Sequence, residues 1–234
     1  MNLNKSARQL AGILCVAASL GLAYSTALRA ADSPPEMSPD GLRLQKNTGS
    51  RLIYVRPGAK FGKYDKVAIL DCLVEFDKNW QNNYNSQQVD PSTFVSTDDM
   101  NRIKKELAAQ FKKIFTQELQ ANGGYQVVDS AASDVLVLRP AIINLRVTQP
   151  DLMTPGISMT VIRSAGSMTL YLELWDSMTN TLLARVMDAQ TDQGLGGPQV
   201  ANSVTNTMAA DFILRQWATA LRKHLEAARA STAG

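Results

Sequence analysis

The stretch LYLELWDSMTNTLLARVMD, Leu170–Asp188, decides the fold, because it predicts two β-strands that fold back on each other. Alternation at period two places one set of side chains against a core and the other set on the opposite face. The DSMTNT turn supplies Asp176 or Ser177 to bond back to the backbone and Asn180 to accept a left-handed conformation. The first strand alternates between the two faces, with Met168, Leu170, Leu172 and Leu174 on one and Thr169, Tyr171, Glu173 and Trp175 on the other.

The acidic residues of this hairpin raise the question of a catalytic site. Glu173 shares its predicted face with Tyr171 and Trp175, and Arg185 on the returning strand is a candidate cross-strand partner. A catalytic carboxylate pair needs a cleft and one carboxyl whose pKa is raised by burial. Nothing in the stretch requires either, so the pattern favours a structural hairpin, with Asp176 as a turn former.

Residues 1–30 read as a secretory signal peptide. Lys5 and Arg8 precede the apolar run LAGILCVAASLGLA, which is shorter than the roughly 20 residues that span a bilayer. No later stretch reaches that length. We therefore expect an exported, periplasmic protein with no integral membrane segment after signal removal.

Two cleavage points fit the pattern, after Ala27 or after Ala30, and Ala30 is preferred. Lipoprotein anchoring through Cys15 is disfavoured, because Leu14 stands where a lipid box requires a small residue. Removal of the peptide takes away three of the 24 basic residues and no acid, which leaves 21 of each sign. A neutral chain gives no long-range attraction to nucleic acid.

The remaining chain predicts a flexible leader over 31–50, one α+β domain over 51–229 and a disordered tail over 230–234. The leader combines prolines with small polar residues and few apolar groups to bury. Order is expected to begin with RLIYVRPG. After cleavage Cys72 is the sole cysteine, so no intramolecular disulfide forms and stability must come from packing.

The stretch KVAILDCLVEFD predicts a strand with one buried face, with Asp71 and Glu75 on the other. This alternation places Cys72 in the core. The alternative, a reactive thiol, needs a nearby cation or helix start and is disfavoured. Pro140 interrupts a second long strand, DVLVLRPAIINLRVT, and indicates an edge position or a bulge. The apolar side of the first strand is expected to consist of Ala68, Leu70, Cys72, Val74 and Phe76.

Two long amphipathic helices are predicted. The first begins near Ser96 or Thr97, with acidic residues in its first turn, and ends at NGG, 122–124. Because it lies between KVAILDCLVEFD and YQVVD, those strands could run parallel. The second spans about 203–228, and its apolar stripe is formed by Met208, Ile213, Leu214, Trp217, Leu221 and Leu225.

A possible interaction surface lies in two segments. The polar loop 77–96 carries Trp80, Tyr84 and Phe94, which either stack on a sugar or peptide or pin the loop to the body, and pinning is favoured. Segment 149–166 has an apolar centre with Ile157 and Val161, and reads either as a flap or as a short extra strand pair.

The sequence offers no constellation for catalysis, cofactor binding or metal binding. The sole histidine, His224, lies at the margin of a helical apolar face, and no cysteine or carboxylate stands at ligand spacing to it. GLGGP lacks the Lys and Ser or Thr of a phosphate loop.

Several stretches together resemble a family of bacterial envelope proteins, the domain-of-unknown-function family three-three-one-three. These are DGLRL, LIYVRPGAKFGKYDKVAIL, YQVVD and LELWDSMTNTLLAR, within residues 40–228. Many members are lipoproteins, whereas this chain lacks the lipid box. The order of elements is more distantly similar to periplasmic domains of curli-export and penicillin-binding-protein-activating lipoproteins. The resemblance implies a compartment and an architecture, and no catalytic residue.

The fold class expected is α+β, a mixed and mostly antiparallel sheet of five or six strands with two long helices on one face. The function expected is an envelope binding or assembly module that is not an enzyme and holds an envelope protein or polymer through a sheet edge or the 149–166 segment. The alternatives are a small-ligand carrier, or a hydrolase of an envelope polymer that uses Asp71, Glu75 or Glu173.

Overall fold

The computed structural model describes residues 33–152, 161–162, 164–194, 199–200 and 202–231. The predicted signal peptide, with both cleavage points and Cys15, lies outside the described residues. Ile157 lies outside them as well, together with most of the predicted tail.

From Pro34 onward the chain forms one unit of sheet and helices. Short 3-10 turns occur at Phe61–Lys63, Pro91–Thr93 and Ala121–Gly123. The strands are β1 (Arg43–Asn47), β2 (Arg51–Val55), β3 (Lys66–Ile69), β4 (Leu73–Phe76), β5 (Gln126–Val127), β6 (Val135–Val147), β7 (Val161–Ile162), β8 (Gly166–Asp176), β9 (Thr181–Thr191) and β10 (Gln199–Val200). The helices are α1 (Trp80–Asn85), α2 (Thr97–Gln120) and α3 (Ser203–Ala230).

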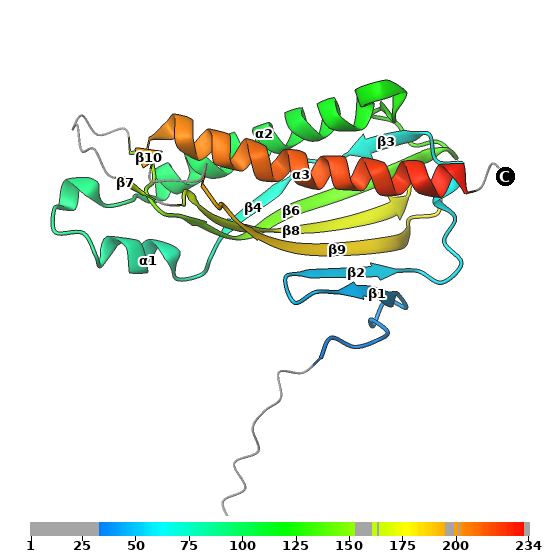
Figure 1. Cartoon of the computed structure of the whole chain (residues 1–234), viewed down its shortest axis with the longest axis horizontal. Helices are drawn as coiled ribbons and strands as arrows, with labels where there is room; N and C mark the ends of the chain where they lie inside the picture. Colours follow the sequence, from blue (N-terminus) through cyan, green and yellow to red (C-terminus); the bar gives the residue numbers. More distant parts are fainter. Residues whose placement is uncertain (1–32, 153–160, 163, 195–198, 201, 232–234) are drawn as a thin grey trace, which may run out of the picture. The chain divides into compact units, whose positions relative to one another are not determined.

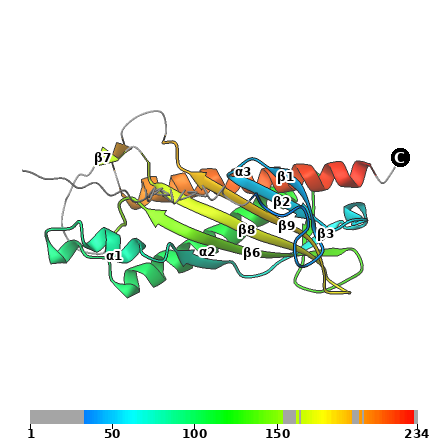
Figure 2. The same ribbon diagram turned by 90° about the horizontal axis from the view of Figure 1, so that it is seen from below.

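The main sheet is mixed, in the order β1-β2-β9-β8-β6-β3-β5, with β4 also paired to β6. The β3 strand runs parallel to β5 and β6, and the other pairs except β4–β6 are antiparallel. Helices α2 and α3 both lie on one face of this sheet (Figure 1), which Figure 2 shows from below. The α+β prediction is confirmed, although the sheet has eight strands instead of five or six.

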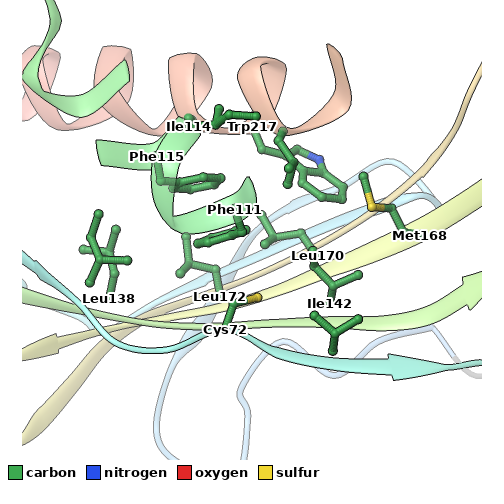
Figure 3. Packing of buried hydrophobic residues seen from close by; sticks show 14 of the residues in the cluster. Cys72, Phe111, Ile114, Phe115, Leu138, Ile142, Met168, Leu170, Leu172 and Trp217 are labelled. Carbon is green, nitrogen blue, oxygen red and sulfur yellow. The ribbon is translucent and has the colours of Figure 1, made fainter. Parts of the chain in front are cut away.

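The hairpin predicted from the opening stretch is β8 and β9. Its register pairs Glu173 with Arg185 and Leu172 with Val186. Met168, Leu170, Leu172 and Leu174 are all buried, so the alternation identified the core face correctly. Figure 3 shows Leu170 and Leu172 pointing toward Phe111 of α2 and Trp217 of α3.

Helix α2 begins where its cap was predicted. Ser96 is the N-cap, and it forms a capping box in which its hydroxyl oxygen accepts from the Asp99 amide and Asp99 accepts from the Ser96 amide. Helix α3 has the same device between Asn202 and Thr205. Met208, predicted in the apolar stripe of α3, is 53% exposed, because it lies nine residues before the buried Trp217 and therefore, at 3.6 residues per turn, on the opposite side of the helix.

The stretch KVAILDCLVEFD forms two strands, so the prediction of one strand was wrong. Val67 and Ile69 are buried in β3, Leu70 is 44% exposed, and burial resumes at Cys72 in the approach to β4. The set of alternate residues that points into the core therefore changes from odd to even positions in the link Leu70–Asp71. Ala68 is only half-buried for the same reason.

Pro140 explains where that break falls. The carbonyl of Leu138 accepts from the Leu70 amide, so the nitrogen of Pro140, two residues on, points to the same neighbouring strand. β3 pairs with β6 only up to Leu138 and β4 only from Ala141, which leaves Pro140 opposite the gap. The prediction of an edge or bulge was wrong, because the missing donor is accommodated by interrupting the neighbour inside the sheet.

Two segments are more ordered than predicted. Residues 43–47 of the expected leader form β1, and Leu42 is fully buried, so order begins before Arg51. Within the expected polar loop 77–96, residues 80–85 form helix α1. The Asn85 side chain exchanges two hydrogen bonds with the backbone of Val95, which compensates for the low helix propensity of the polar residues.

Candidate functional site

One face of the sheet lies away from α2 and α3, and we call it the open face. Residues directly opposite each other in an antiparallel pair share a face, and Glu173 of β8 pairs with Arg139 of β6 on one side and Arg185 of β9 on the other. The centre of the open face is therefore formed by Arg139, Ala141, Tyr171, Glu173, Trp175, Arg185 and Met187.

Glu173 lies at the centre of this face and is 7% exposed. Its Oε1 accepts hydrogen bonds from Tyr171 Oη at 2.9 Å and from Arg185 Nη2 at 2.9 Å and Nε at 3.1 Å. Its Oε2 accepts from Trp175 Nε1 at 3.1 Å. The predicted pairing with Arg185 is confirmed, and both carboxylate oxygens are already engaged in structural contacts.

The arginines of the open face lie over its aromatic rings. The Arg139 guanidinium is 5.5 Å from the centre of the Trp175 ring, and that of Arg185 is 5.7 Å from the centre of the Tyr171 ring. Burial, followed by the hydrogen bond to Glu173, raises the pKa of Tyr171 above its usual value. Trp, Tyr and Arg are the residue types that contribute most to protein–protein interfaces.

The segment before β1 bounds the open face on the β2 side. Asp40 forms an ion pair with Arg185 at 2.8 Å, and Tyr54 Oη donates to the Pro35 carbonyl at 2.9 Å. Leu42, Tyr54 and Leu182 form a second, small apolar cluster under this segment. The chain thus covers the β2 side of the open face, where Trp175 packs against this cluster, and leaves Arg139 exposed on the β6 side.

The aromatic residues predicted as an interaction surface take different positions. Trp80 and Tyr84 are 7% and 9% exposed, and Trp80 stacks on Phe76 at 4.5 Å and donates from Nε1 to the Val147 carbonyl. Their rings pin α1 to the body of the domain. Phe94 is 43% exposed and remains accessible. Val161 lies in β7, which pairs with β10.

The three carboxylates considered for a hydrolase, Asp71, Glu75 and Glu173, each pair with a different basic residue. The Asp71 side chain is 99% exposed and pairs with Lys112, whereas Glu75 pairs with Lys104 at 2.6 Å. Glu173 lies on the open face. Among the described residues no group of three or more His, Cys, Asp or Glu side chains is placed to hold a metal ion. His224 is exposed on α3.

Cys72 is 8% exposed and belongs to the main core, as the alternation predicted. Burial raises the pKa of its thiol to about 12. Because the thiolate is the nucleophile, this environment keeps the side chain unreactive.

The outer strands of the sheet are short. β1 has five residues, with a register irregularity between Leu44 and Lys46, and most of its side chains are exposed and polar. β4 has four residues. Short, bulged and charged edges discourage the addition of a further strand.

A comparison with models of protein families identifies the family of this chain. Residues 37–221 match the model of a family described as protein of unknown function, DUF3313. The chain belongs to this family, which confirms the resemblance inferred from the sequence. A search of curated proteins finds no match.

Several solved structures show a distant similarity to this chain. The PelC dodecamer from Paraburkholderia phytofirmans has 12% identity and a TM-score of 0.38, over 74% of this chain and 97% of that one. The hypothetical protein CT253 from Chlamydia trachomatis has 9% identity and a TM-score of 0.38, over 69% of this chain and 98% of that one. Protein XCC0632 from Xanthomonas campestris, of family DUF330, has 14% identity and a TM-score of 0.38, over 73% of this chain and 89% of that one.

No helix in the described part of the chain is long and apolar enough to cross a membrane.

Proposed function

We propose that this protein is an exported accessory protein of the bacterial envelope, which binds another envelope protein and catalyses no reaction. The observation that carries the proposal is the open face, where Trp175, Tyr171 and two arginines lie on a side of the sheet that neither long helix covers. The signal-peptide pattern of residues 1–30 supports the compartment.

The geometry favours the open face over a sheet edge as the contact surface. Strand addition needs a long free row of backbone donors and acceptors, whereas β1 and β4 have only five and four residues. On the open face the hydrogen bonds to Glu173 hold Tyr171, Trp175 and Arg185 in fixed positions. Side chains that are already ordered lose less entropy when a partner binds.

The same contacts argue against the hydrolase. A hydrolase of this kind needs two carboxyls that face each other across a cleft. Both oxygens of Glu173 accept bonds from its neighbours, and Glu75 pairs with Lys104. Measurable hydrolysis of peptidoglycan by the purified protein, lost in Glu75→Gln, would overturn this part of the proposal.

Photocrosslinking in whole cells tests the contact surface. A photoreactive amino acid replaces Arg139 or Met187 on the open face, and Gln117 on the exposed side of α2 serves as the matched control. We expect both open-face positions to give an adduct with the same envelope protein, identified by mass spectrometry, and the control to give none. Adducts from Gln117 but from neither open-face position would show that the partner binds the helical layer.

A further inference from the structure

A groove of about 170 Å³ lies between α3 and the helix-side residues of β2, β8 and β9. On β8 these residues are buried, but Ile53, Val55 and Val186 beside them are only half-buried, since α3 does not close over β2. The walls are almost entirely apolar, and the main contributors are Ile53, Val55, Leu172, Val186, Trp217 and Leu221.

The charged or polar residues of the groove lining are Arg51, Asp188 and His224. The Asp188 side chain is 3% exposed, and its Oδ2 accepts from Arg51 Nη2 at 2.6 Å, Arg51 Nε at 2.8 Å and Trp217 Nε1 at 3.1 Å. Its Oδ1 accepts from Gln190 Nε2 at 3.1 Å. The buried charge is therefore satisfied by the protein itself and needs no ligand.

The ion pair with Asp188 engages only the Nη2 and Nε atoms of Arg51. Its side chain is 32% exposed, and in the described part of the chain its Nη1 makes no hydrogen bond. A guanidinium carries five N–H donors in a fixed plane, so the Nη1 side remains able to bind an anion. An apolar groove thus meets a partly exposed cationic donor.

We propose that this groove binds a single-chain anionic amphiphile, a medium-chain fatty carboxylate, with its chain between α3 and the sheet and its carboxylate on Nη1 of Arg51. The volume is similar to that of an engineered apolar cavity of about 150 Å³ that takes benzene. It fits one chain of roughly six to eight carbons, whereas a diacyl lipid has two long chains. The inference does not depend on the open face, which lies on the other side of the sheet.

Titration of the wild-type protein with fatty carboxylates tests the chain and the head separately. Burial of each CH₂ group strengthens binding about fourfold, so octanoate should bind roughly 15-fold more tightly than hexanoate. Octanol, with the same chain and no charge, should bind several-fold more weakly than octanoate. Phosphatidylglycerol vesicles should not bind, and binding to vesicles in place of octanoate would overturn the assignment to a free amphiphile.

Methyl NMR locates the ligand. The methyl signals of Ile53, Val55 and Leu221 should shift saturably with octanoate, whereas that of Ile114, which is buried on the core side of α2 and does not line the groove, should not. Shifts that avoid the three groove residues, or that never saturate, would overturn the proposal. This measurement uses the unmodified protein and therefore does not depend on whether a variant folds.

A pair of variants on α3 tests the groove directly. Ala220 lines it, whereas Ala227 is exposed on the same helix. Ala220→Phe should fill the groove and weaken octanoate binding at least about tenfold, and Ala227→Phe should bind like the wild type. Arg51→Gln should remove the preference for octanoate over octanol, provided that methyl NMR shows the variant to be folded. Equal octanoate binding by both Ala variants would contradict the proposed site.

Discussion

The two faces of β8 differ in what their side chains do, although they alternate within one strand. The covered face consists of Met168, Leu170, Leu172 and Leu174, all at most 4% exposed under α2 and α3. The open face holds its residues by hydrogen bonds around Glu173. Stability therefore comes mainly from one face, while the other retains polar and aromatic groups available for recognition.

Both faces contain buried acids, Glu173 on the open face and Asp176 and Asp188 on the covered face, and their partners differ. Asp176 pairs in register with the fully buried Leu136, which places it at the end of the covered face. It accepts from Lys63 Nζ at 2.6 Å and Tyr64 Oη at 2.7 Å. Asp176 thus connects distant parts of the chain, as Asp188 does through Arg51 and Trp217, whereas the side-chain partners of Glu173 among the described residues lie within the β8–β9 hairpin.

The largest expected difference between the two faces is in thiol reactivity. In a Cys15→Ser background, Cys72 on the covered side should react with a thiol reagent at least about 1,000-fold more slowly in the native protein than in denaturant, because a typical domain opens globally at a cost of 5 kcal/mol or more. Arg139→Cys on the open face, made in a Cys72→Ala background, should react nearly as fast as in denaturant. Rapid native labelling of Cys72 would place its side chain outside the core.

Core deletion gives the next largest effect. Leu172→Ala should lower the free energy of unfolding by about 3–4 kcal/mol, since it removes a buried side chain that packs under both helices. Thr169→Ala on the other face should change it by less than about 1 kcal/mol. Chemical denaturation measures both, and similar losses would show that the open face is also covered.

Asp176→Asn should cost about 2 kcal/mol at pH 7, because it removes the charge that binds Lys63 while keeping the side-chain volume. Lys63, followed by Tyr64 and the Thr179 backbone among the groups that act in this direction, lowers the pKa of Asp176 below its ordinary value. The stabilisation is therefore present above about pH 4 and is lost as the pH falls through the lowered pKa.

The difference in stability between the wild type and Asp176→Asn should narrow as the pH falls from 7 to 2. Denaturation midpoints along that series measure the narrowing. A difference that stays constant over the whole range would mean that the charge of Asp176 does not contribute.

Glu173→Gln should have a smaller effect than Asp176→Asn, about 1 kcal/mol, since the Gln oxygen retains some of the hydrogen bonds from Tyr171, Trp175 and Arg185. Its consequence for recognition should be larger than for stability. Tyr171 and Trp175 lose their shared anchor, so crosslinking from Arg139 should fall while the denaturation midpoint moves little. A collapse of the fold would instead make Glu173 a structural residue.

The sequence predicted the features that depend on neighbours in the chain. The alternation of β8, the Ser96 cap and the Glu173–Arg185 pair all follow from local spacing. The break between β3 and β4 was missed, because KVAILDCLVEFD alternates through it and only the position of Pro140 on another strand determines where pairing stops.

The groove had no signal in the sequence. It combines Arg51 from β2, Asp188 from β9 and Trp217 from α3, which are far apart in the chain and meet only when the sheet forms. Asp188 lies in an alternating strand, where an acid is normally assigned to solvent. Its near-complete burial depends on donors from two other elements, and local pattern analysis does not include them.

Pro140 interrupts the hydrogen bonding along one side of the central strand β6, and the strand can open locally at this point. Its nitrogen carries no exchangeable proton, and the strand beside it ends at Ile69 and resumes at Leu73. On the side of β6 that faces β3 and β4, no continuous row of hydrogen bonds joins the residues before Pro140 to those after it. On that side, the two halves of β6 are therefore coupled through side-chain packing in the core. Hydrogen exchange should therefore report two units within one strand: amides paired with β3 and amides paired with β4 should exchange with separate opening free energies.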